Sequence, residues 1–108
     1  MITIITPSFN RAHTLPKCYE SLMKQTSSNF EWMIIDDGSS DNTRELVENW
    51  IDKTTKFKIS YFYKSNGGKA SALNLAFDNL ETEFAVILDS DDTFYSDAIE
   101  SATAQLQS

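Results

Sequence analysis

Short apolar runs alternate along this chain with longer segments in which apolar residues recur every three or four positions. The apolar runs occupy residues 2–6, 31–35, 57–63 and 84–88. Brief runs of β-branched and aromatic side chains are typical of strands, whereas apolar residues at the longer spacing are typical of helices. Strands that alternate with helices form a mostly parallel sheet with helices on its faces. We therefore expect an α/β fold, a Rossmann-like three-layer α/β/α sandwich.

Four segments carry the helical pattern. The first spans residues 13–25 and the second about 42–52, where Asn42 and Glu45 have the spacing of a capping box. The third follows Gly67-Gly68, and its alanines predict close packing on the sheet. The side chains expected to face the core are Leu15, Cys18, Tyr19, Leu22 and Met23 in the first helix, Leu46, Val47, Trp50 and Ile51 in the second, Leu73, Ala76, Phe77 and Leu80 in the third, and Ile99, Ala102 and Leu106 in the fourth.

The predicted strands are of two kinds. Residues 57–63 alternate apolar with polar side chains, which is typical of an edge strand with one wetter face. Residues 84–88 form the most continuously apolar run. Each strand is followed by polar residues, at 6–10, 36–39, 66–69 and 89–92. Because ligands of such folds bind beyond the carboxyl ends of the strands, we expect these four loops to converge on one binding rim.

The composition fits one domain. With 108 residues, of which 41% are hydrophobic, the chain is long enough for one core but not for two. Its formal net charge of −7 repels phosphate backbones, so nucleic acid is not an expected partner. An anionic ligand would need a local positive charge, and a bound divalent cation is the usual source.

The lone cysteine and the lone histidine predict no catalytic chemistry. Cys18 has no disulfide partner and falls in the apolar stripe of the first helix, so we expect a core residue and a reducing compartment. His13 is expected at the surface or as a helix cap. The chain has neither an apolar run of about 18 residues nor the basic flank of a signal peptide, which predicts a cytoplasmic protein. A tether on a longer parent protein would place it at the inner face of the membrane.

Residues on the rim suit a metal and a phosphate. Asp89 and Asp91 lie two residues apart, so both side chains point to one side of an extended backbone, and carboxylate oxygens suit Mg²⁺ or Mn²⁺. Lys69 supplies a cation beside a helix N-terminus, which favours a phosphate. The chain has no P-loop, no GxGxxG and no nucleophile elbow. The rim therefore predicts an anionic ligand bound by other means.

An ordered set of motifs covers essentially all 108 residues. They are Thr6-Pro7-Ser8-Phe9-Asn10-Arg11, Gln25-Thr26, Glu31-Trp32, Ile35-Asp36-Asp37-Gly38-Ser39-Ser40-Asp41, Asn66-Gly67-Gly68-Lys69 with Ala72 and Asn74, and Asp89-Ser90-Asp91-Asp92. In this order and spacing, the set resembles the N-terminal half of a family 2 glycosyltransferase of the GT-A fold. That family comprises inverting enzymes that use nucleotide-diphospho-sugars. Leu73 stands where the family often has an Arg.

The resemblance implies a donor site on the rim. Thr6 and the acidic pair, particularly Asp37, would hold uracil or an equivalent base, and Lys69 would approach the phosphates. Asp91 would be the chief ligand of Mn²⁺ or Mg²⁺, with Asp89 near the ribose. The implied donor-binding residues are Thr6, Pro7, Asn10, Arg11, Asp36, Asp37, Lys69, Asp89 and Ser90, and the implied metal ligands are Asp91 and Asp89.

The resemblance also implies an acceptor-binding half outside residues 1–108. An inverting transfer needs a general base that takes the proton of the acceptor hydroxyl, and the family places this Asp or Glu beyond residue 108. Residues 1–108 are thus expected to bind a donor, preferably a UDP-sugar, and to transfer no sugar alone. The acceptor would be a saccharide or a lipid-linked molecule in cell-wall or polysaccharide biosynthesis. Family-like winding predicts the strand order third, second, first, fourth, which leaves residues 84–88 at an uncovered edge that favours self-association.

Two other functions remain open from the sequence alone. Residues 86–93 also resemble the motif of haloacid-dehalogenase-like phosphatases, in which Asp89 would be a phosphorylated nucleophile. That motif normally begins its domain, however. The other alternative is a module that binds nucleotide-sugars without catalysis. The sequence identifies neither the sugar nor the acceptor.

Overall fold

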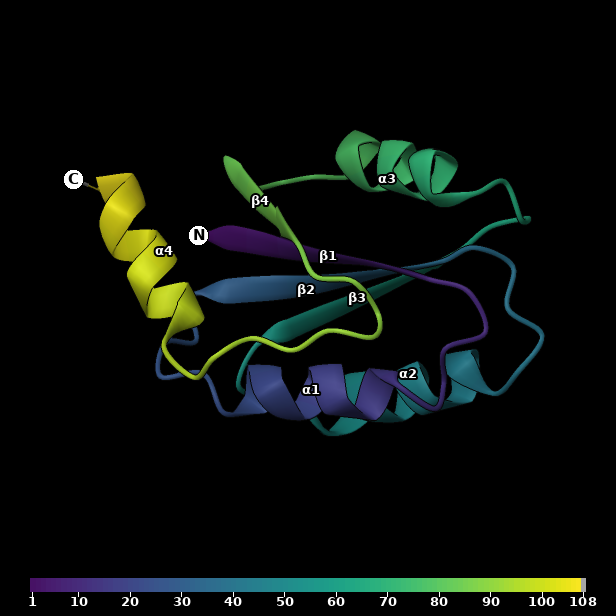
Figure 1. The fold of residues 1–108 in the computed structure, drawn as a ribbon, viewed down its shortest axis with the longest axis horizontal. Coiled ribbons are helices and arrows are strands. Elements are labelled where there is room, and N and C mark those ends of the chain that lie inside the picture. Colours follow the sequence, from purple (N-terminus) through teal and green to yellow (C-terminus); the bar gives the residue numbers. More distant parts are fainter. Residues whose placement is uncertain (108) are drawn as a thin grey trace.

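Strands and helices alternate along the whole described chain, as the sequence predicts. The structure is a computed structural model that describes residues 1–107, and these form four strands and four helices (Figure 1). In chain order they are β1 (Ile2–Ser8), α1 (Leu15–Met23), β2 (Phe30–Asp36), α2 (Thr43–Lys53), β3 (Lys58–Tyr63), α3 (Lys69–Asp78), β4 (Phe84–Ile87) and α4 (Ala98–Gln107).

The sheet is parallel throughout and has the order β3-β2-β1-β4. Ile4 of β1 lies opposite Trp32 of β2 on one side and Val86 of β4 on the other. The predicted order is confirmed, as are the edge positions of β3 and β4. Because parallel strands all end at one rim, the segments that follow them open on the same side of the molecule.

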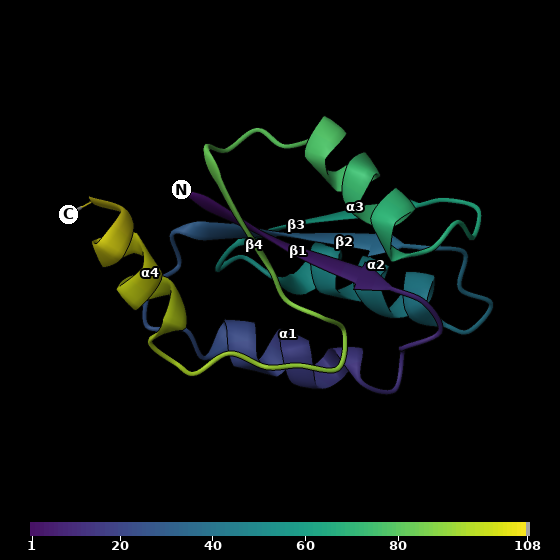
Figure 2. The same ribbon diagram turned by 45° about the horizontal axis from the view of Figure 1, so that its top comes forward.

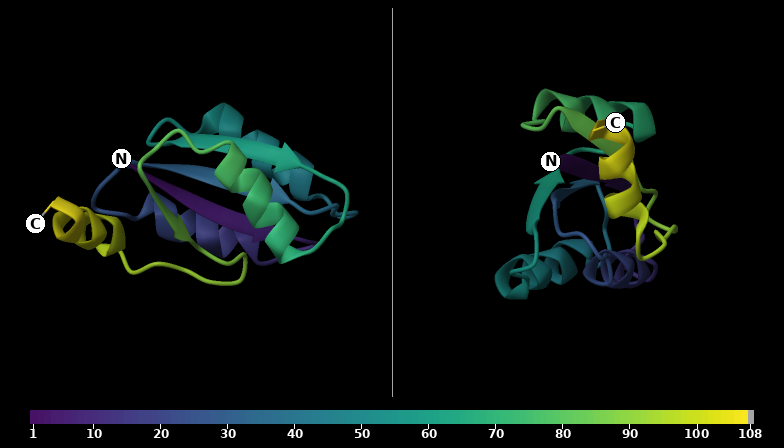
Figure 3. Two further views of the ribbon diagram at one scale, coloured as in Figure 1. Left: turned by 90° about the horizontal axis from the view of Figure 1, so that it is seen from above. Right: turned by 90° about the vertical axis from the view of Figure 1, so that its left-hand side faces the viewer.

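Helices cover the two faces of the sheet unequally. α1 and α2 lie on one face and α3 on the other, which confirms the three-layer sandwich (Figures 1 and 2). α4 stands beyond the end at which the strands begin (Figure 3), and Ile99 joins it to the core on the α1 and α2 face. Across residues 1–107, each helix is too short or too polar to span a lipid bilayer.

Aromatic side chains fill the core between the sheet and the α1 and α2 pair. The rings of Tyr19 and Trp50 stack with centroids 4.5 Å apart, and those of Trp32 and Trp50 are 5.7 Å apart. Such pairs contribute about 0.5–1.5 kcal/mol beyond the burial of their area. Trp50 and Cys18 are both buried here, so the prediction that they are core residues is confirmed.

Small side chains let α3 approach the opposite face closely. Ala72 and Ala76 are fully buried against Ile5, Met33 and Ile35. A larger side chain at either alanine would force the helix away from the sheet. The close packing predicted from the alanines is therefore confirmed.

Some side chains that the helical pattern assigned to the core are exposed. The spacing of apolar residues identifies which side of a helix faces the sheet. Residues at the margin of that side are buried only where another element lies beside them. The core predictions are wrong for Met23, Ile51, Phe77 and Leu106.

The first turn of α2 is capped by a residue other than the predicted one. Asn42 precedes the helix but makes no side-chain cap hydrogen bond. Instead, a carboxylate oxygen of Asp41 accepts a hydrogen bond from the backbone N–H of Thr43 at 3.1 Å. The capping-box prediction is wrong because the Asp41 side chain reaches its own backbone two residues on, as Asp does in turns.

Candidate functional site

A pocket of about 390 Å³ opens at the rim where the strands end. The loop after β1, the loop after β2, the first turns of α3 and the loop after β4 all contribute to it, so the predicted convergence is confirmed. Its volume lies within the roughly 300–1,000 Å³ of small-molecule sites. Of the predicted site residues, Pro7, Arg11, Asp37, Lys69, Asp89, Ser90 and Asp91 line the pocket, whereas Thr6, Asn10 and Asp36 lie outside its lining.

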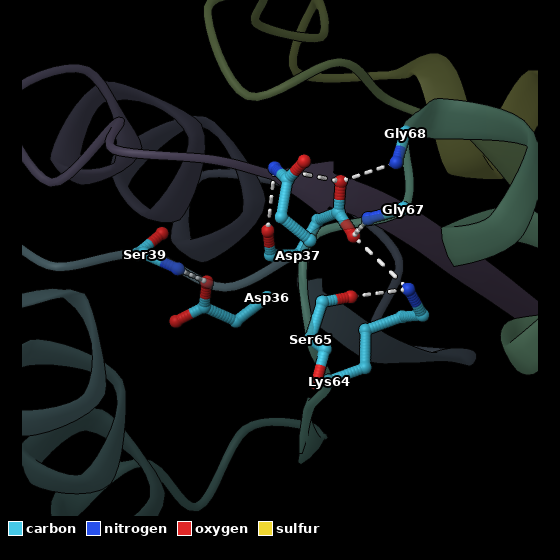
Figure 4. A network of polar contacts seen from close by, with 8 residues as sticks. Asp36, Asp37, Ser39, Lys64, Ser65, Gly67 and Gly68 are labelled. Atoms are coloured by element: carbon cyan, nitrogen blue, oxygen red, sulfur yellow. Dashed lines mark hydrogen bonds and ion pairs between the residues drawn. The ribbon is translucent and has the colours of Figure 1, made fainter.

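Asp37 holds the turn that leads into α3 (Figure 4). Its carboxylate accepts hydrogen bonds from the backbone N–H groups of Gly67 and Gly68, each at 2.9 Å, and from Lys64 Nζ at 3.1 Å. A longer contact comes from Asn66 Nδ2 at 3.4 Å. Gly68 has a φ of 92°, a conformation that glycine adopts without strain. The carboxylate therefore fixes both the turn and the start of α3.

These contacts keep Asp37 ionised. Burial alone would raise the pKa of the Asp37 carboxyl, but hydrogen bonds from Gly67, Lys64 and Gly68, with the charge of Lys64, lower it below its ordinary value. Hydrogen bonds to the charged form of a carboxylate have this effect. Asp37 is thus a fixed negative charge in the pocket wall at neutral pH.

Thr6 and Asp36 are buried and already have partners within the protein. Thr6 Oγ1 accepts a hydrogen bond from Trp32 Nε1 at 2.8 Å. Asp36 accepts hydrogen bonds from the backbone N–H of Ser39 at 2.8 Å and from the Tyr61 hydroxyl. Burial and the Asp36 carboxylate raise the pKa of Tyr61, which therefore stays a hydrogen-bond donor. Both residues precede pocket-lining residues in the chain, and their side chains make contacts within the protein outside the pocket lining.

Asn10 joins the loops after β1 and β2. Its backbone N–H donates to Ser39 Oγ at 2.8 Å, and its side-chain carbonyl accepts from the backbone N–H of Ser40 at 2.8 Å. Its φ of 52° lies in the left-handed region, which asparagine tolerates better than most residues. The two loops are therefore held together at the pocket, beside Pro7 and Arg11.

Asp89 and Asp91 reach the pocket from the loop after β4. Asp89 Oδ1 forms an ion pair with Lys69 Nζ at 2.9 Å, and both side chains are substantially exposed. Exposed ion pairs contribute only about 0–1 kcal/mol, so this pair resists a competing ligand weakly. Within residues 1–107, the Asp91 carboxylate makes no hydrogen bond or ion pair. These two carboxylates are available to a metal ion, whereas the Asp37 carboxylate already accepts four contacts from within the protein.

The donor set fits a metal ion that is also held by its substrate. Across residues 1–107, no three His, Cys, Asp or Glu side chains lie together as a complete metal site. Mg²⁺ usually takes one or two carboxylates and completes its coordination with water and substrate phosphates. Asp89 and Asp91 supply two such oxygen ligands in one pocket. The chemistry of these donors therefore suits Mg²⁺ or Mn²⁺ bound together with a diphosphate.

Three residues at the site have no signal of their own in the sequence. Ser8 and Phe9 line the pocket, where Ser8 Oγ is buried and has no hydrogen-bond partner among residues 1–107. Both belong to the first quoted motif, and this membership is the signal that could have identified them as site residues. Lys64 follows β3 and forms an ion pair with Asp37 at 3.1 Å. Nothing in the spacing of Lys64 indicates that partner, which is 27 residues away.

Sequence comparisons connect the chain to known glycosyltransferases. A profile described as "Glycosyl transferase family 2" matches residues 3–108. An uncharacterized glycosyltransferase of Rickettsia felis is 44% identical over 99 residues, which cover 92% of this chain and 16% of that protein. Glycosyltransferase GlyG of Streptococcus pneumoniae is 31% identical over 107 residues, which cover 99% of this chain and 35% of that protein.

Solved structures agree with the sequence comparisons. TarS of S. aureus in complex with UDP-GlcNAc superposes with a TM-score of 0.89 at 28% identity, over 98% of this chain and 31% of that chain. The mannosyltransferase PcManGT of Pyrobaculum calidifontis, in complex with GDP-Man and Mn²⁺, superposes with a TM-score of 0.89 at 25% identity, over 99% of this chain and 32% of that chain. The chain thus spans only 16–35% of the relatives named here. With the GT-A fold and the motif order in agreement, the chain belongs to glycosyl transferase family 2.

Proposed function

We propose that residues 1–108 are the donor-binding part of an inverting glycosyltransferase and hold a nucleotide-diphospho-sugar together with Mn²⁺ or Mg²⁺. The observation that carries this proposal is the rim pocket in which Asp37, Lys69, Asp89 and Asp91 meet. Similar structures of TarS contain UDP or UDP-GlcNAc, and that of PcManGT contains GDP-Man and Mn²⁺. The shared fold supports the same ligand class here, with a UDP-sugar favoured.

The charges around the pocket suit a diphosphate that arrives with a cation. Three lining carboxylates, of Asp37, Asp89 and Asp91, face two lining cations, Arg11 and Lys69. A diphosphate alone would add negative charge to a pocket that already has an excess of it. When bound at Asp91 and Asp89, the metal ion would supply Lewis-acid stabilisation of the leaving diphosphate. Lys69 would add a positive charge beside the diphosphate, and to do so its Nζ must break the ion pair with Asp89.

We assign the base to the wall formed by the loops after β1 and β2. Pro7 and Arg11 shape this wall, and Asn10 joins its two loops. The hydrogen bonds of Thr6 to Trp32 and of Asp36 to Ser39 would keep the strand ends and the loop after β2 in place. The Asp37 carboxylate would accept a hydrogen bond from a uracil N–H. This bond would replace the longest contact of the carboxylate, which is 3.4 Å from Asn66 Nδ2. Ser90 completes the pocket beside Asp89. Loss of the Asp37 acceptor should weaken UDP binding by about 1–3 kcal/mol, the effect of an unpaired buried donor.

The acceptor half and its general base are proposed to lie outside residues 1–108. The support is that this chain spans 16% of the Rickettsia felis protein and 35% of GlyG. Residues 1–108 alone should then transfer no sugar, because no group deprotonates the acceptor hydroxyl. The acceptor would be a saccharide or a lipid-linked molecule, and the exposed edge of β4 would pair with another chain when uncovered.

The match to glycosyl transferase family 2 over residues 3–108 leaves the phosphatase alternative without support. A module that binds nucleotide-sugars without catalysis differs from the transferase only in turnover. Sugar transfer by the full-length parent protein, measured with and without acceptor, separates these two functions.

Titration calorimetry with UDP tests donor binding. We expect UDP to bind more tightly with Mn²⁺ than with EDTA, and the gain to be lost in Asp91→Asn, because the carboxylate is the chief proposed metal ligand. Asp78→Asn removes the same charge from an exposed position outside the pocket and should leave the gain intact. Lys69→Ala should weaken UDP and GDP alike, whereas Asp37→Ala should change the preference between bases. Equal UDP affinity with Mn²⁺ and with EDTA would refute metal-assisted donor binding.

A further inference from the structure

The segment that carries Asp89 and Asp91 has almost no regular structure. Residues 88–97 lie between β4 and α4 and contain turns but neither strand nor helix. The Leu88 N–H donates a hydrogen bond to the Ile5 carbonyl at 2.9 Å, which ties the start of the segment to β1, and the bond from Asp92 N–H to the Asp89 carbonyl, at 3.0 Å, is a turn within the segment. Buried backbone groups must find partners elsewhere, so the partners of this segment determine its shape.

Those partners come mainly from one face of α1 and its two flanks. Thr14, Cys18, Ser21 and Gln25 are spaced by four, three and four residues, which places them on one side of the helix. We call these four residues the α1 ladder. Figure 2 shows the segment between β4 and α4, in yellow-green, running along α1.

The N-terminal half of the α1 ladder binds the acidic turn itself. Thr14 Oγ1 donates a hydrogen bond to the Ser90 carbonyl at 2.8 Å. Cys18 Sγ donates to the Asp92 carbonyl at 2.9 Å, with the carbonyls of Ser90 and Asp89 at 3.4 and 3.5 Å. The Ser90 and Asp92 carbonyls, one on each side of Asp91, therefore both accept hydrogen bonds from the α1 ladder.

The C-terminal half of the α1 ladder binds the rest of the segment. Ser21 Oγ accepts a hydrogen bond from the backbone N–H of Phe94 at 3.3 Å. Gln25 donates to the Tyr95 carbonyl at 2.7 Å and accepts from the backbone N–H of Ile99 at 3.1 Å. Ser21 and Gln25 are both buried, so these contacts are shielded from competing water. The ladder thus follows the segment from the pocket to the first turn of α4.

We propose that the α1 ladder positions the carboxylates of Asp89 and Asp91 in the pocket by fixing the backbone of residues 89–92. Its members are positioning residues, because none of them lines the pocket. The expected effect on metal-assisted donor binding rests on the proposed function. The claim that the ladder fixes the backbone of residues 89–92 depends only on the hydrogen bonds described above. Among residues 1–107, the Asp91 carboxylate makes no hydrogen bond or ion pair, and the Asp89 carboxylate has only its exposed ion pair with Lys69, so both depend on this backbone for their position.

Hydrogen exchange and calorimetry test the proposal with three variants at Cys18 and Thr14. Thr14→Val keeps the side-chain shape but removes the donor, Cys18→Val removes the donor and adds one methyl-sized group, and Cys18→Ser restores a donor. In Cys18→Val we expect the Asp92 and Phe94 amides to exchange about fivefold faster, the factor that one lost hydrogen bond contributes. The Mn²⁺-dependent gain in UDP affinity should fall by a similar factor, while the affinity in EDTA stays unchanged. Cys18→Ser should recover most of both.

Tyr19→Phe is the matched control. It removes a hydrogen bond between α1 and Thr54, at 2.6 Å, that does not involve the acidic segment. In this variant, the exchange rate of the Asp92 amide and the Mn²⁺-dependent gain in UDP affinity should equal those of the unmodified protein. Thr14→Val covers the case in which Cys18→Val fails to fold, because Thr14 is only half-buried.

The two parts of the inference fail in different ways. If Asp92 and Phe94 exchange at unchanged rates in both Val variants, the α1 ladder does not fix the segment and the proposal is overturned. If exchange rises but the Mn²⁺ gain persists, the ladder does not position the carboxylates, and the proposal is overturned in its functional part. If the unmodified protein shows no Mn²⁺ gain, the proposed function has failed, and exchange alone decides whether the ladder holds the segment.

Discussion

β4 is the more continuously apolar of the two strands, yet β2 is the more deeply buried. β2 is flanked by β1 and β3, and its residues 32–36 are all buried. Within residues 1–107, β4 pairs with β1 alone, and Phe84 and Ile87 remain 39% and 44% exposed. Burial therefore follows the place of a strand in the sheet, and the apolar character of its sequence does not determine it.

The loops that follow these two strands differ in the same way. After β2, the carboxylates of Asp36, Asp37 and Asp41 all accept hydrogen bonds from within the protein. After β4, Asp89 has one exposed ion pair, and Asp91 has no hydrogen bond or ion pair among the described residues. The two acidic turns therefore have different roles. The turn after β2 forms part of the pocket wall, and the turn after β4 offers carboxylates to a metal ion.

The largest expected effect comes from removing matched side chains from the two strands. Ile34 of β2 is fully buried, whereas Ile87 of β4 is 44% exposed. Ile34→Ala should lower the free energy of unfolding by about 2–5 kcal/mol, since it leaves a cavity in a packed core. Ile87→Ala should lower it by well under half as much. Urea unfolding of both variants measures the difference, and equal losses would mean that β4 is buried as β2 is.

A smaller effect is expected from the two acidic turns. Asp37→Asn should lower the free energy of unfolding at neutral pH by about 1.5–3 kcal/mol, the contribution of hydrogen bonds to a charged group. Asp92→Asn should change it little, because the Asp92 carboxylate is exposed and has no hydrogen-bond or ion-pair partner within residues 1–107. Urea titrations of both variants at pH 7 provide the measurement. A similar loss in the two variants would contradict the division between the turns.

The pH dependence of stability sharpens the same comparison. The pKa of Asp37 is lowered in the folded protein, so the unfolded chain binds the proton more readily. The contribution of Asp37 is therefore fully present above its unfolded pKa of about 4 and is lost as the pH falls through the folded pKa. Asp37→Asn should flatten the fall in stability below about pH 4. Unfolding curves between neutral and acidic pH test this, and an unchanged slope would contradict it.

The smallest effect is expected on association through the edge of β4. Ile87→Lys should weaken self-association of the chain, because a charge on an edge strand opposes pairing with another strand. Ile51→Lys is the control, since Ile51 is 39% exposed but lies on α2. Sedimentation equilibrium compares the two variants with the unmodified protein. If all three are monomeric at high concentration, the exposed edge is not a pairing site.

The sequence predicted the fold more completely than the site. The order of the elements, the sheet order and both edge strands follow from periodic patterns and from the resemblance to a known family, and the structure confirms them. The patterns failed where burial depends on a neighbour: Met23 and Phe77 fit the helical spacing of apolar residues, yet both side chains are exposed. The capping residue of α2 was also misassigned, because two adjacent side chains competed for the same turn.

By itself the sequence determined that four polar loops would meet at one rim, because parallel strands end on the same side of a sheet. Only the tertiary structure decided what each polar group does there. Asp37 finds the Gly67 N–H 30 residues away, and Cys18 finds the Asp92 carbonyl 74 residues away. Periodicity records which face of an element is apolar, and it carries no information about such partners. Which carboxylates are held and which are free is therefore decided when the loops are brought together.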